Sequence, residues 1–317
     1  MVVCVAALVS LALGVPSARA AAGAREAPPA STPPREESGS HWQSRWPRFH
    51  PIEAAVMVAA EAIAITVYFG AGDRDVRWSE PAPLDPELRG MMRLRAYEDQ
   101  HTIDQVSDAL FITLTAWPVF VDALLIAGAL HGDTDAAWQM LLIDLETLAI
   151  AHLVTWITNR FTGRVRPRHV ECAPADTCAD RGIGPVASFA SGHTLMAFTG
   201  ASLTCVHHLH HPWMLGGMAG AALACGSALG LATAVGAMRV MADLHWASDV
   251  ALSAMIGSAI GWGVPLLLHY LRPQDGPAAS AGSEATRSEA TRSEAGRWAI
   301  VPGGSADGPG VALTGSF

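Results

Sequence analysis

Long apolar segments separated by short polar stretches dominate the chain from residue 51 to residue 270. Most of these segments come close to the ~20 residues that a helix needs to cross a hydrocarbon core. They cover residues 51–70, 107–131, 135–158, 193–210, 213–237 and 245–270. The pattern predicts an all-α fold, a membrane-embedded bundle of about six helices. A soluble bundle whose core helices only look membranous is the alternative.

Acidic residues interrupt several of the apolar segments, at Glu61, Asp122, Asp144 and Glu146. Ionisable groups are costly beside lipid, so we expect these side chains to face the interior of the bundle. Glycines are also frequent, and small residues allow two helices to approach closely. We expect such contacts at Gly216, Gly217, Gly220, Gly226 and Gly230.

The amino-terminal part of the chain has a different character. Residues 1–20 contain an apolar run that ends in the sequence Ala-Arg-Ala, which is typical of a signal peptide, and an amino-terminal anchor is the alternative. Residues 21–50 are predicted to be a disordered linker, because they begin with a stretch rich in Ala, Pro, Glu and Ser. Trp42, Trp46 and Phe49 near the end of this linker indicate an approach to the membrane interface.

Two further polar segments complete the organisation of the chain. Residues 71–103 are rich in Arg and acidic residues, and we expect a surface connection with some amphipathic helix there. Residues 271–317 form a predicted disordered tail that contains the near-repeat SEATR. Its last part has two short apolar runs around a Gly/Pro-rich turn, which favours a terminal hairpin.

Composition and charge support the membrane interpretation and exclude one class of function. Half of the 317 residues are hydrophobic and only 15% are charged, whereas about a quarter is usual for soluble domains. The net charge of -9 gives no basic surface, so nucleic-acid binding is not expected. All 20 basic residues are Arg, because the chain contains no Lys.

The cysteines and a histidine cluster offer no convincing metal site. Cys172 and Cys178 lie close together in a polar loop without further ligands at zinc spacing, so we interpret them as a candidate disulfide. Such a disulfide would place its loop in an oxidising compartment. The histidines at 207, 208, 210 and 211 are better interpreted as an interfacial turn than as metal ligands.

The first of three polar motifs is the run GRVRP at residues 163–167, just after the third main helix. Its arginines, Arg164 and Arg166, can bind phosphate oxygens in bidentate geometry. Anchoring of a membrane helix is the structural alternative.

The second motif is Ser191-Gly192-His193, which opens the helix at 193–210. Free N–H groups at a helix start attract anions, and Gly allows close approach of a ligand. Ser191 adds a hydroxyl donor and His193 a proton carrier. A helix cap with a solvated histidine is the structural alternative.

The third motif is Arg239, His245 and Asp249. His245 and Asp249 are four residues apart and share one helical face. A carboxylate bonded to one ring nitrogen fixes the tautomer and raises the basicity of the other nitrogen. Together, the motifs could hold a phosphate on Arg side chains while one His attacks and another protonates the leaving oxygen.

The order GRVRP, SGH and R-x5-H-x3-D resembles the signature of the phosphatidic acid phosphatase type 2/haloperoxidase superfamily. The motifs span residues 159–249, within a helical domain expected at residues 51–270. The resemblance implies that His245 is the nucleophile, Asp249 its orienting carboxylate and His193 the general acid. It implies that Arg166, Arg239, Ser191 and the Gly192 backbone hold the phosphate.

Three positions depart from the family pattern. Asn159 stands where the family has a Lys, Ala190 where it has Pro, and Met238 where it has Ser. Arg160 and Arg164 are the candidates for replacing the missing Lys. The change at Asn159 puts affinity or substrate choice in doubt more than the reaction class.

The resemblance implies a metal-independent phosphatase, without a cofactor, that hydrolyses a lipid phosphate or pyrophosphate monoester through a phosphohistidine. A soluble extracytoplasmic acid phosphatase or a haloperoxidase, which would bind vanadate, stays open, as does a non-catalytic membrane protein that binds a phosphate headgroup. The expected partners are the membrane and the lipid substrate, and no protein partner can be inferred.

We expect a bacterial inner-membrane protein with an extracytoplasmic active site. Six spans with the amino terminus inside give this arrangement. A cleaved signal peptide before six spans would place the motif loops in the cytoplasm instead.

Overall fold

The computed structural model describes residues 40–70, 75–170, 186–271, 297–305 and 308–316. The chain forms two compact units, residues 1–273 and 274–317, and each is described by itself. The predicted signal peptide or anchor at residues 1–20 and the candidate disulfide between Cys172 and Cys178 lie outside the described residues.

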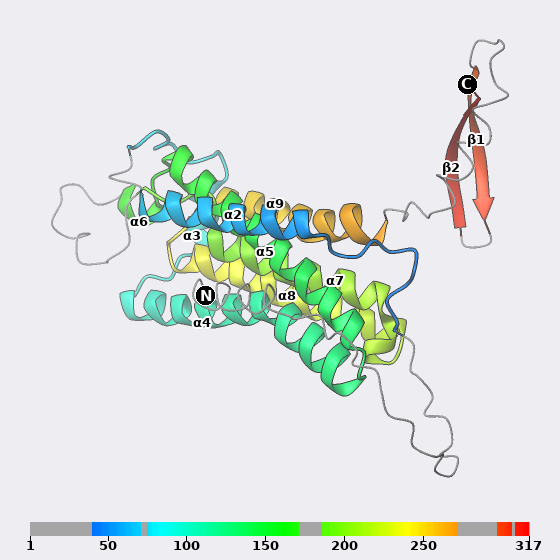
Figure 1. Ribbon diagram of the computed structural model, residues 1–317. Coiled ribbons are helices and arrows are strands. Elements are labelled where there is room, and N and C mark those ends of the chain that lie inside the picture. Colours follow the sequence, from blue (N-terminus) through cyan, green and yellow to red (C-terminus); the bar gives the residue numbers. More distant parts are fainter. Residues whose placement is uncertain (1–39, 71–74, 171–185, 272–296, 306–307, 317) are drawn as a thin grey trace, which may run out of the picture. The chain divides into compact units, whose positions relative to one another are not determined.

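Long helices lying side by side build the first unit (Figure 1). They are α2 (Pro51–Phe69), α4 (Tyr97–Trp117) continued by η1 (Pro118–Leu130), α5 (Thr134–Thr162), α7 (Gly192–His210), α8 (Met218–Met241), and α9 (Ala247–Pro265) continued by η4 (Leu266–Tyr270). The short elements α3 (Asp85–Met92), α6 (Pro167–Val170) and η3 (Pro212–Leu215) connect them. All six predicted helices are present, and the all-α bundle is confirmed.

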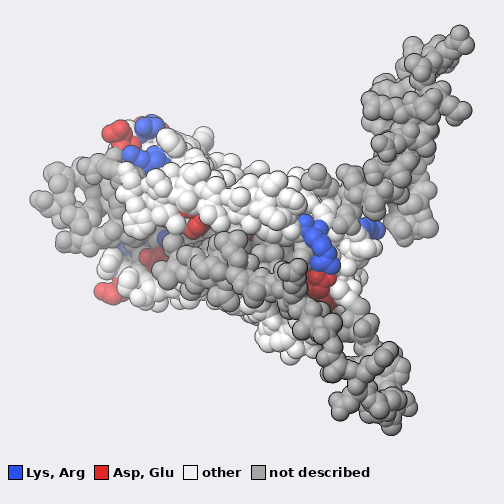
Figure 2. Space-filling view, in the orientation of Figure 1, with Lys and Arg blue, Asp and Glu red and all other residues white. Residues whose placement is uncertain are grey.

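Within the described residues, five helices are long and apolar enough to cross a membrane: α2, α4 with η1, α5, α8, and α9 with η4. Large apolar side chains on them are exposed, among them Ile52, Leu223, Met255 and Leu267. Figure 2 shows a surface over α2 that is almost free of charged residues between the two ends of the bundle. This surface matches a helical bundle embedded in a membrane.

The remaining predicted helix is α7, which differs from the other five because it lies in the middle of the bundle. It packs against α4, α5, α8 and α9, and nearly all of its side chains are buried. A Cβ added at Gly200 would lie 2.2 Å from the carbonyl oxygen of Leu114, and one at Gly257 equally close to that of Leu195. Close packing of α7 therefore depends on these two glycines.

The predicted close contacts at the glycines of α8 and the preceding loop are not present. A Cβ at Gly216, Gly217, Gly226 or Gly230 would meet no atom within 4 Å, and one at Gly220 would meet only Leu215 of its own connection. The reason is position, since Gly226 and Gly230 are exposed residues of α8.

Buried ionisable groups form a polar layer away from the motif loops. Asp122, Asp144 and Glu146 are buried, as expected, and Glu61 is half-buried. His207 bonds to Asp144 at 2.7 Å and His208 to Asp122 at 3.1 Å. His211 is also buried, so the interpretation of this cluster as an interfacial turn is wrong for three of its four histidines. Carboxylate and tyrosine partners inside the bundle offset the free-energy cost of burying these histidines.

Residues 40–50 pack against this end of the bundle, although the sequence analysis placed them in a disordered linker. Trp46 is only 2% exposed, and its ring contacts His211 and Tyr270 edge-on. Trp42 is buried beside it and donates its indole N–H to the carbonyl of Trp46. The expectation of an interfacial approach is therefore wrong for both tryptophans, whose rings lie inside the protein.

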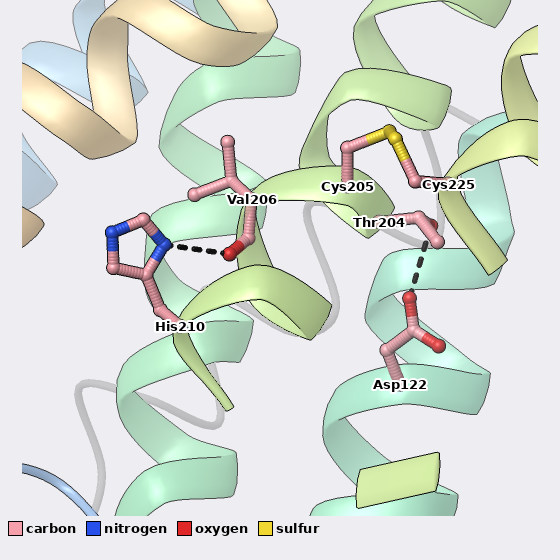
Figure 3. Close-up of a disulfide and its surroundings, with 6 residues drawn as sticks. All are labelled: Asp122, Thr204, Cys205, Val206, His210 and Cys225. Carbon is pink, nitrogen blue, oxygen red and sulfur yellow. Dashed lines mark hydrogen bonds between the residues drawn. A yellow bond between two sulfur atoms is a disulfide. The ribbon is translucent and has the colours of Figure 1, made fainter. Parts of the chain in front are cut away.

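A disulfide that the sequence analysis did not predict joins Cys205 of α7 to Cys225 of α8 (Figure 3). Their Cα atoms are 4.4 Å apart. Beside it, Thr204 donates a hydrogen bond to Asp122 at 2.9 Å. The disulfide therefore joins α7 to α8, and the hydrogen bond from the adjacent residue joins α7 to η1.

The second unit contains the predicted terminal hairpin. Strands β1 (Arg297–Ser305) and β2 (Gly308–Ser316) pair antiparallel, with Trp298 opposite Gly315. The strands lie where the sequence favours a terminal hairpin.

Candidate active site

The three sequence motifs meet at one end of the first unit, which we call the motif end and define as residues 163–168, 188–193 and 239–249. Helix geometry brings them together, because α5 and α8 end there and α7 and α9 begin there. The charges of Arg166, Arg239 and His193 all act on the ring of His245. The four predicted side chains therefore share one electrostatic environment.

The end of α5 positions the first motif. Gly163 caps this helix in the left-handed region, with φ of 57°. A Cβ there would lie 2.5 Å from the carbonyl oxygen of Asp75, so only Gly fits. The chain then pairs with Trp78 through the main-chain N–H of Val165, which donates to the Trp78 carbonyl at 3.0 Å.

His245 is 3% exposed, and its Nδ1 lies 2.6 Å from the carbonyl oxygen of Ser188. A carbonyl oxygen only accepts, so Nδ1 carries the proton and Nε2 keeps a lone pair. Burial lowers the pKa of His245 well below 6.5, and the charges of Arg166 and Arg239 lower it further. The ring is therefore neutral at neutral pH, as a nucleophile must be.

Asp249 contacts Ser188 rather than His245 itself. Its carboxylate accepts from the Ser188 hydroxyl at 2.5 Å, from the main-chain N–H of Trp246 at 3.0 Å, and from Arg164. The resemblance implied a direct role for Asp249 in orienting His245. In the structure Ser188 stands between them, with its carbonyl on the histidine and its hydroxyl on the carboxylate.

Arg164 forms ion pairs inside the protein and is 1% exposed. It donates to Asp249 and, at 2.7 Å, to Asp85, and its guanidinium lies 3.9 Å from the centre of the Trp78 ring. Its two terminal nitrogens are thus bonded to carboxylates, while its buried Nε has no hydrogen-bond partner among the described residues. Asp85 lies in the stretch predicted to be a surface connection, and nothing in its surroundings in the sequence distinguished it.

Arg166 and Arg239 share with Arg164 a donor nitrogen at the motif end that is unpaired within the described part of the chain. Among the described residues, the Nε atom of each is buried and has no hydrogen-bond partner. Arg239 donates through one terminal nitrogen to Asp104 and, at 2.7 Å, to Ser107. Burial and the charges of Arg239 and Arg168 lower the pKa of Arg166 to about 9, which still leaves it cationic at neutral pH.

His193 follows Gly192 at the start of α7, and its Nε2 lies 2.7 Å from the carboxylate of Asp108. The carboxylate accepts, so Nε2 carries a proton, and a second proton on the imidazolium sits on Nδ1. Asp104, Ser107 and Asp108 lie on one face of α4 and hold both Arg239 and His193. Their spacing of three and four residues at the start of an apolar helix was the signal that could have found them.

The remaining predicted residues are placed in different ways. The Ser191 hydroxyl pairs with that of Thr194 at 2.9 Å, and its main-chain N–H donates to Ser253. Gly192 opens α7, where the first main-chain N–H groups of a helix have no partner within it. Arg160 makes no hydrogen bond or ion pair with the part of the chain that the structure describes.

Asn159, which replaces the Lys of the family, does not point a free donor at the site. Its Nδ2 atom donates to the carbonyl of Ala190 at 2.7 Å and to that of Thr155 at 3.2 Å. The side chain thus joins α5 to the residue that precedes the second motif, and both of its amide protons are used.

A basic cavity of about 550 Å³ adjoins the motif end. Trp246 lines it together with Arg89, Arg93 and Arg95. Arg89 and Arg93 form ion pairs with Asp243, at 2.6 and 3.3 Å. The cavity wall is therefore rich in guanidinium groups next to the residue that follows His245.

Comparison with known proteins gives one family. Residues 141–273 match the model of the PAP2 superfamily, and all three motifs lie within the matched region. The match confirms the resemblance stated from the motifs. The chain is a helical membrane protein that contains a PAP2-type region.

A solved structure is also similar: "Crystal structure of the first transmembrane PAP2 type phosphatidylglycerolphosphate phosphatase from Bacillus subtilis". The identity is 19%, the similarity covers 67% of this chain and 86% of that chain, and the TM-score is 0.38. At this identity and TM-score the likeness says nothing of the activity of this chain. A comparison with curated proteins gives no match.

Proposed function

We propose that this protein is a membrane phosphatase that hydrolyses a lipid phosphate or pyrophosphate monoester through a phosphohistidine, without a metal ion in the reaction. One observation carries the proposal. The neutral ring of His245, with Nε2 available, lies in the field of Arg166 and Arg239, and each of these keeps a buried Nε without a partner in the described part of the chain. A phosphate fits such a site, because guanidinium donors neutralise its oxygens.

In the first step Nε2 of His245 attacks phosphorus, and a P–N bond forms as the bond to the leaving oxygen breaks. Arg166 and Arg239, with the N–H groups at the start of α7, neutralise the charge on the other phosphate oxygens. His193 gives its Nδ1 proton to the leaving oxygen, while Asp108 holds Nε2. The Ser188 carbonyl stabilises the positive charge that develops on His245.

In the second step water attacks the phosphohistidine from the side that the leaving group has vacated. His193, now neutral, takes a proton from the water, and the new P–O bond replaces the P–N bond. Inorganic phosphate leaves, and His245 and His193 return to their starting protonation states. No metal ion and no redox change enters the balance of either step.

A lipid substrate is supported by the position of the site at the ends of five apolar helices. The arginines around the adjoining cavity would suit an anionic headgroup. A soluble acid phosphatase is the less favoured alternative, because a surface of exposed apolar helices does not suit an aqueous protein. A haloperoxidase would use the same arginines for vanadate, and a headgroup-binding protein would use them without turnover.

The test is phosphate release by the purified protein in the presence of EDTA. The panel contains phosphatidate, an isoprenyl pyrophosphate and a soluble aryl phosphate, each with wild type, H245A and, as a matched control, H101A at an exposed position of α4. We expect turnover on a lipid substrate that H245A abolishes and H101A retains. Full turnover by H245A would overturn the phosphohistidine, and vanadate-dependent bromide oxidation without phosphate release would favour the haloperoxidase.

We also propose that the motif end faces the extracytoplasmic side of a bacterial inner membrane. The resemblance supports this side, and so does the candidate disulfide expected in the loop after the first motif. Helix α9 runs from the motif end to the opposite end of the bundle, so a carboxy-terminal fluorescent protein reports the other side. We expect green fluorescence, because GFP folds in the cytoplasm, and its absence with full expression would reverse the orientation.

A further inference from the structure

A second group of chemically active side chains lies far from the motif end. Glu53 of α2, Glu146 of α5 and His269 of η4 each offer a donor atom, and these three atoms lie within 4.8 Å of one another. His269 is 20 positions after Asp249 along α9 and η4, which corresponds to about 30 Å of helix. The group is therefore separate from the candidate active site.

Burial distinguishes this group from an ordinary surface cluster. His269 is 0% exposed, Glu146 is 2% exposed, and Glu53 is half-buried. The ring of His269 is covered by Phe49, whose plane stacks on it at a centroid distance of 6.2 Å. The donors are thus shielded by the segment that precedes α2.

The charges in the group are not balanced by the protein. Among the described residues, Glu146 has only His269 as an ion-pair partner, at a long 3.4 Å, and Glu53 has none. The Nδ1 atom of His269 is buried without a hydrogen-bond partner in the same part of the chain. Two carboxylates this close repel each other unless a proton or a cation lies between them.

Other histidine–carboxylate pairs in the bundle lack the third donor. His207 bonds to Asp144, His208 to Asp122, and within the described residues no further Cys, His or acid joins either pair at ligand distance. In the part of the chain that the structure describes, only the group at Glu53 has a carboxylate from each of two helices and an imidazole from a third element. This donor set is the one that transition cations such as Zn²⁺ prefer.

We infer that Glu53, Glu146 and His269 bind a divalent transition-metal cation of the Zn²⁺ type, which joins α2, α5 and η4. Metal–ligand distances of about 2.1 Å place neighbouring donors within about 3.5 Å of one another, so small side-chain rotations close the site. Water completes the coordination. The ion neutralises the two carboxylates and stabilises the folded bundle, and it takes no part in the phosphatase reaction.

This inference revises the expectation that the chain has no metal ligands. The histidines at 207, 208, 210 and 211 form a cluster in the sequence, whereas these ligands come from three segments that are far apart in it. The inference also does not rest on the proposed function. H245A should bind the ion as wild type does, whatever its turnover.

The experiment measures metal bound to the full-length protein in detergent, after removal of adventitious metal and equilibration with Zn²⁺ or Co²⁺. We expect about one ion per chain, a visible ligand-field absorption with Co²⁺, and a rise in Tm of several degrees at saturating Zn²⁺. E146Q and H269Q should lose the bound ion and the rise in Tm.

Two further variants keep the test decisive. E53Q preserves the helix cap, because Gln can replace Glu in a capping box, so the variant should fold. Its affinity for Zn²⁺ should nevertheless be at least about tenfold lower than that of wild type. E61Q is the matched control, since Glu61 pairs with His152 at 3.0 Å between the same two helices without a third ligand. E61Q should bind like wild type. A wild-type protein that binds no ion, or equal binding by E53Q and E61Q, would overturn the inference.

Discussion

The main-chain carbonyl of Ser188 accepts a hydrogen bond from His245 at 2.6 Å, while the hydroxyl of the same residue donates to Asp249 at 2.5 Å. Ser188 therefore transmits the position of the carboxylate to the histidine. Arg164 holds the carboxylate from the other side, and Asp85 in turn holds Arg164. In the proposed mechanism these residues position the nucleophile without touching the substrate.

The first prediction concerns this link. S188A removes the bond to Asp249 and leaves the carbonyl in place but less firmly held. We expect kcat to fall about 10- to 100-fold with little change in KM, because the attacking nitrogen loses its fixed orientation. S202A, at a buried serine of α7 whose hydroxyl has no partner in the described chain, should leave both constants unchanged. Equal kinetics for the two variants would show that Ser188 plays no positioning part.

The second prediction concerns pH. The pKa of His245 lies well below 6.5, because burial and two arginine charges disfavour its protonation. Since the attacking ring must be neutral, kcat/KM should stay high as pH falls to 6.5 and decline only below it. The measurement is a pH profile of kcat/KM, corrected for the separately measured titration of the substrate phosphate. An acid limb centred above pH 6.5 would contradict the environment described for His245.

The third prediction concerns the proton donor. Asp108 holds Nε2 of His193, and D108N weakens the general acid while leaving the nucleophile intact. A poor alkoxide leaving group needs protonation more than a nitrophenolate does. D108N should therefore lose at least about tenfold more kcat on a lipid phosphate than on p-nitrophenyl phosphate. D99N, at an exposed acid on the same helix, is the control and should change neither value. Equal losses on both substrates would remove His193 from the acid role.

The fourth prediction concerns stability. D85N leaves Arg164 with one buried carboxylate partner and weakens the bonds to Ser248, so we expect the free energy of unfolding to fall by about 3 kcal/mol. E87Q, at an exposed acid of the same short helix, should have no measurable effect. The double variant D85N/R164Q should lose less than the two single losses added together, because the sites are coupled. Additive losses would contradict the ion pair.

Asp85 also sets a pH dependence of stability. Burial alone would raise its pKa, but hydrogen bonds from Ser248, Ala82 and Arg164 outweigh burial and lower the pKa below 3.8. The stabilisation is therefore complete above the unfolded value and is lost as pH falls through the folded one. Acid unfolding of D85N should lack this contribution.

The fifth prediction concerns Asn159. N159A leaves the carbonyl of Ala190 without its donor inside the protein, which should cost about 1–3 kcal/mol in unfolding free energy. The loop before the second motif should loosen, and kcat should fall with it. Q43A, an amide removed from an exposed position, is the control. Thermal unfolding together with initial rates checks both parts, and an unaffected N159A would show that this bond stabilises nothing.

The sequence predicted the helices well because membrane helices are marked by long apolar runs. The exception is the start of α4, where residues 97–103 carry Glu, Asp, Gln and His and were interpreted as part of a surface connection. Asp104, just after this stretch, bonds to Arg239 of the third motif, whereas Asp99 and His101 are exposed.

Contacts that depend on loop geometry could not be predicted. The pairing of Ser188 with His245 involves a main-chain carbonyl, and any residue type offers one. The spacing of His245 and Asp249 indicated a shared helical face, but α9 begins at Ala247, so His245 lies in the turn before the helix and Ser188 stands between it and Asp249. The Cys205–Cys225 disulfide likewise depends on the packing of two helices that sequence patterns describe separately.

The central position of α7 has a consequence for how the protein is made. Its Thr199, Ser202, Thr204 and His207 are all buried among neighbouring helices, and α7 is not among the helices apolar enough to cross a membrane by themselves. A translocon that sorts segments by hydrophobicity would hold such a helix poorly. Stable insertion of α7 therefore waits for α8 and α9, which follow it in the chain and cover its polar groups. Insertion of α7 therefore depends on the helices that follow it, and a fragment truncated after α7 should be degraded.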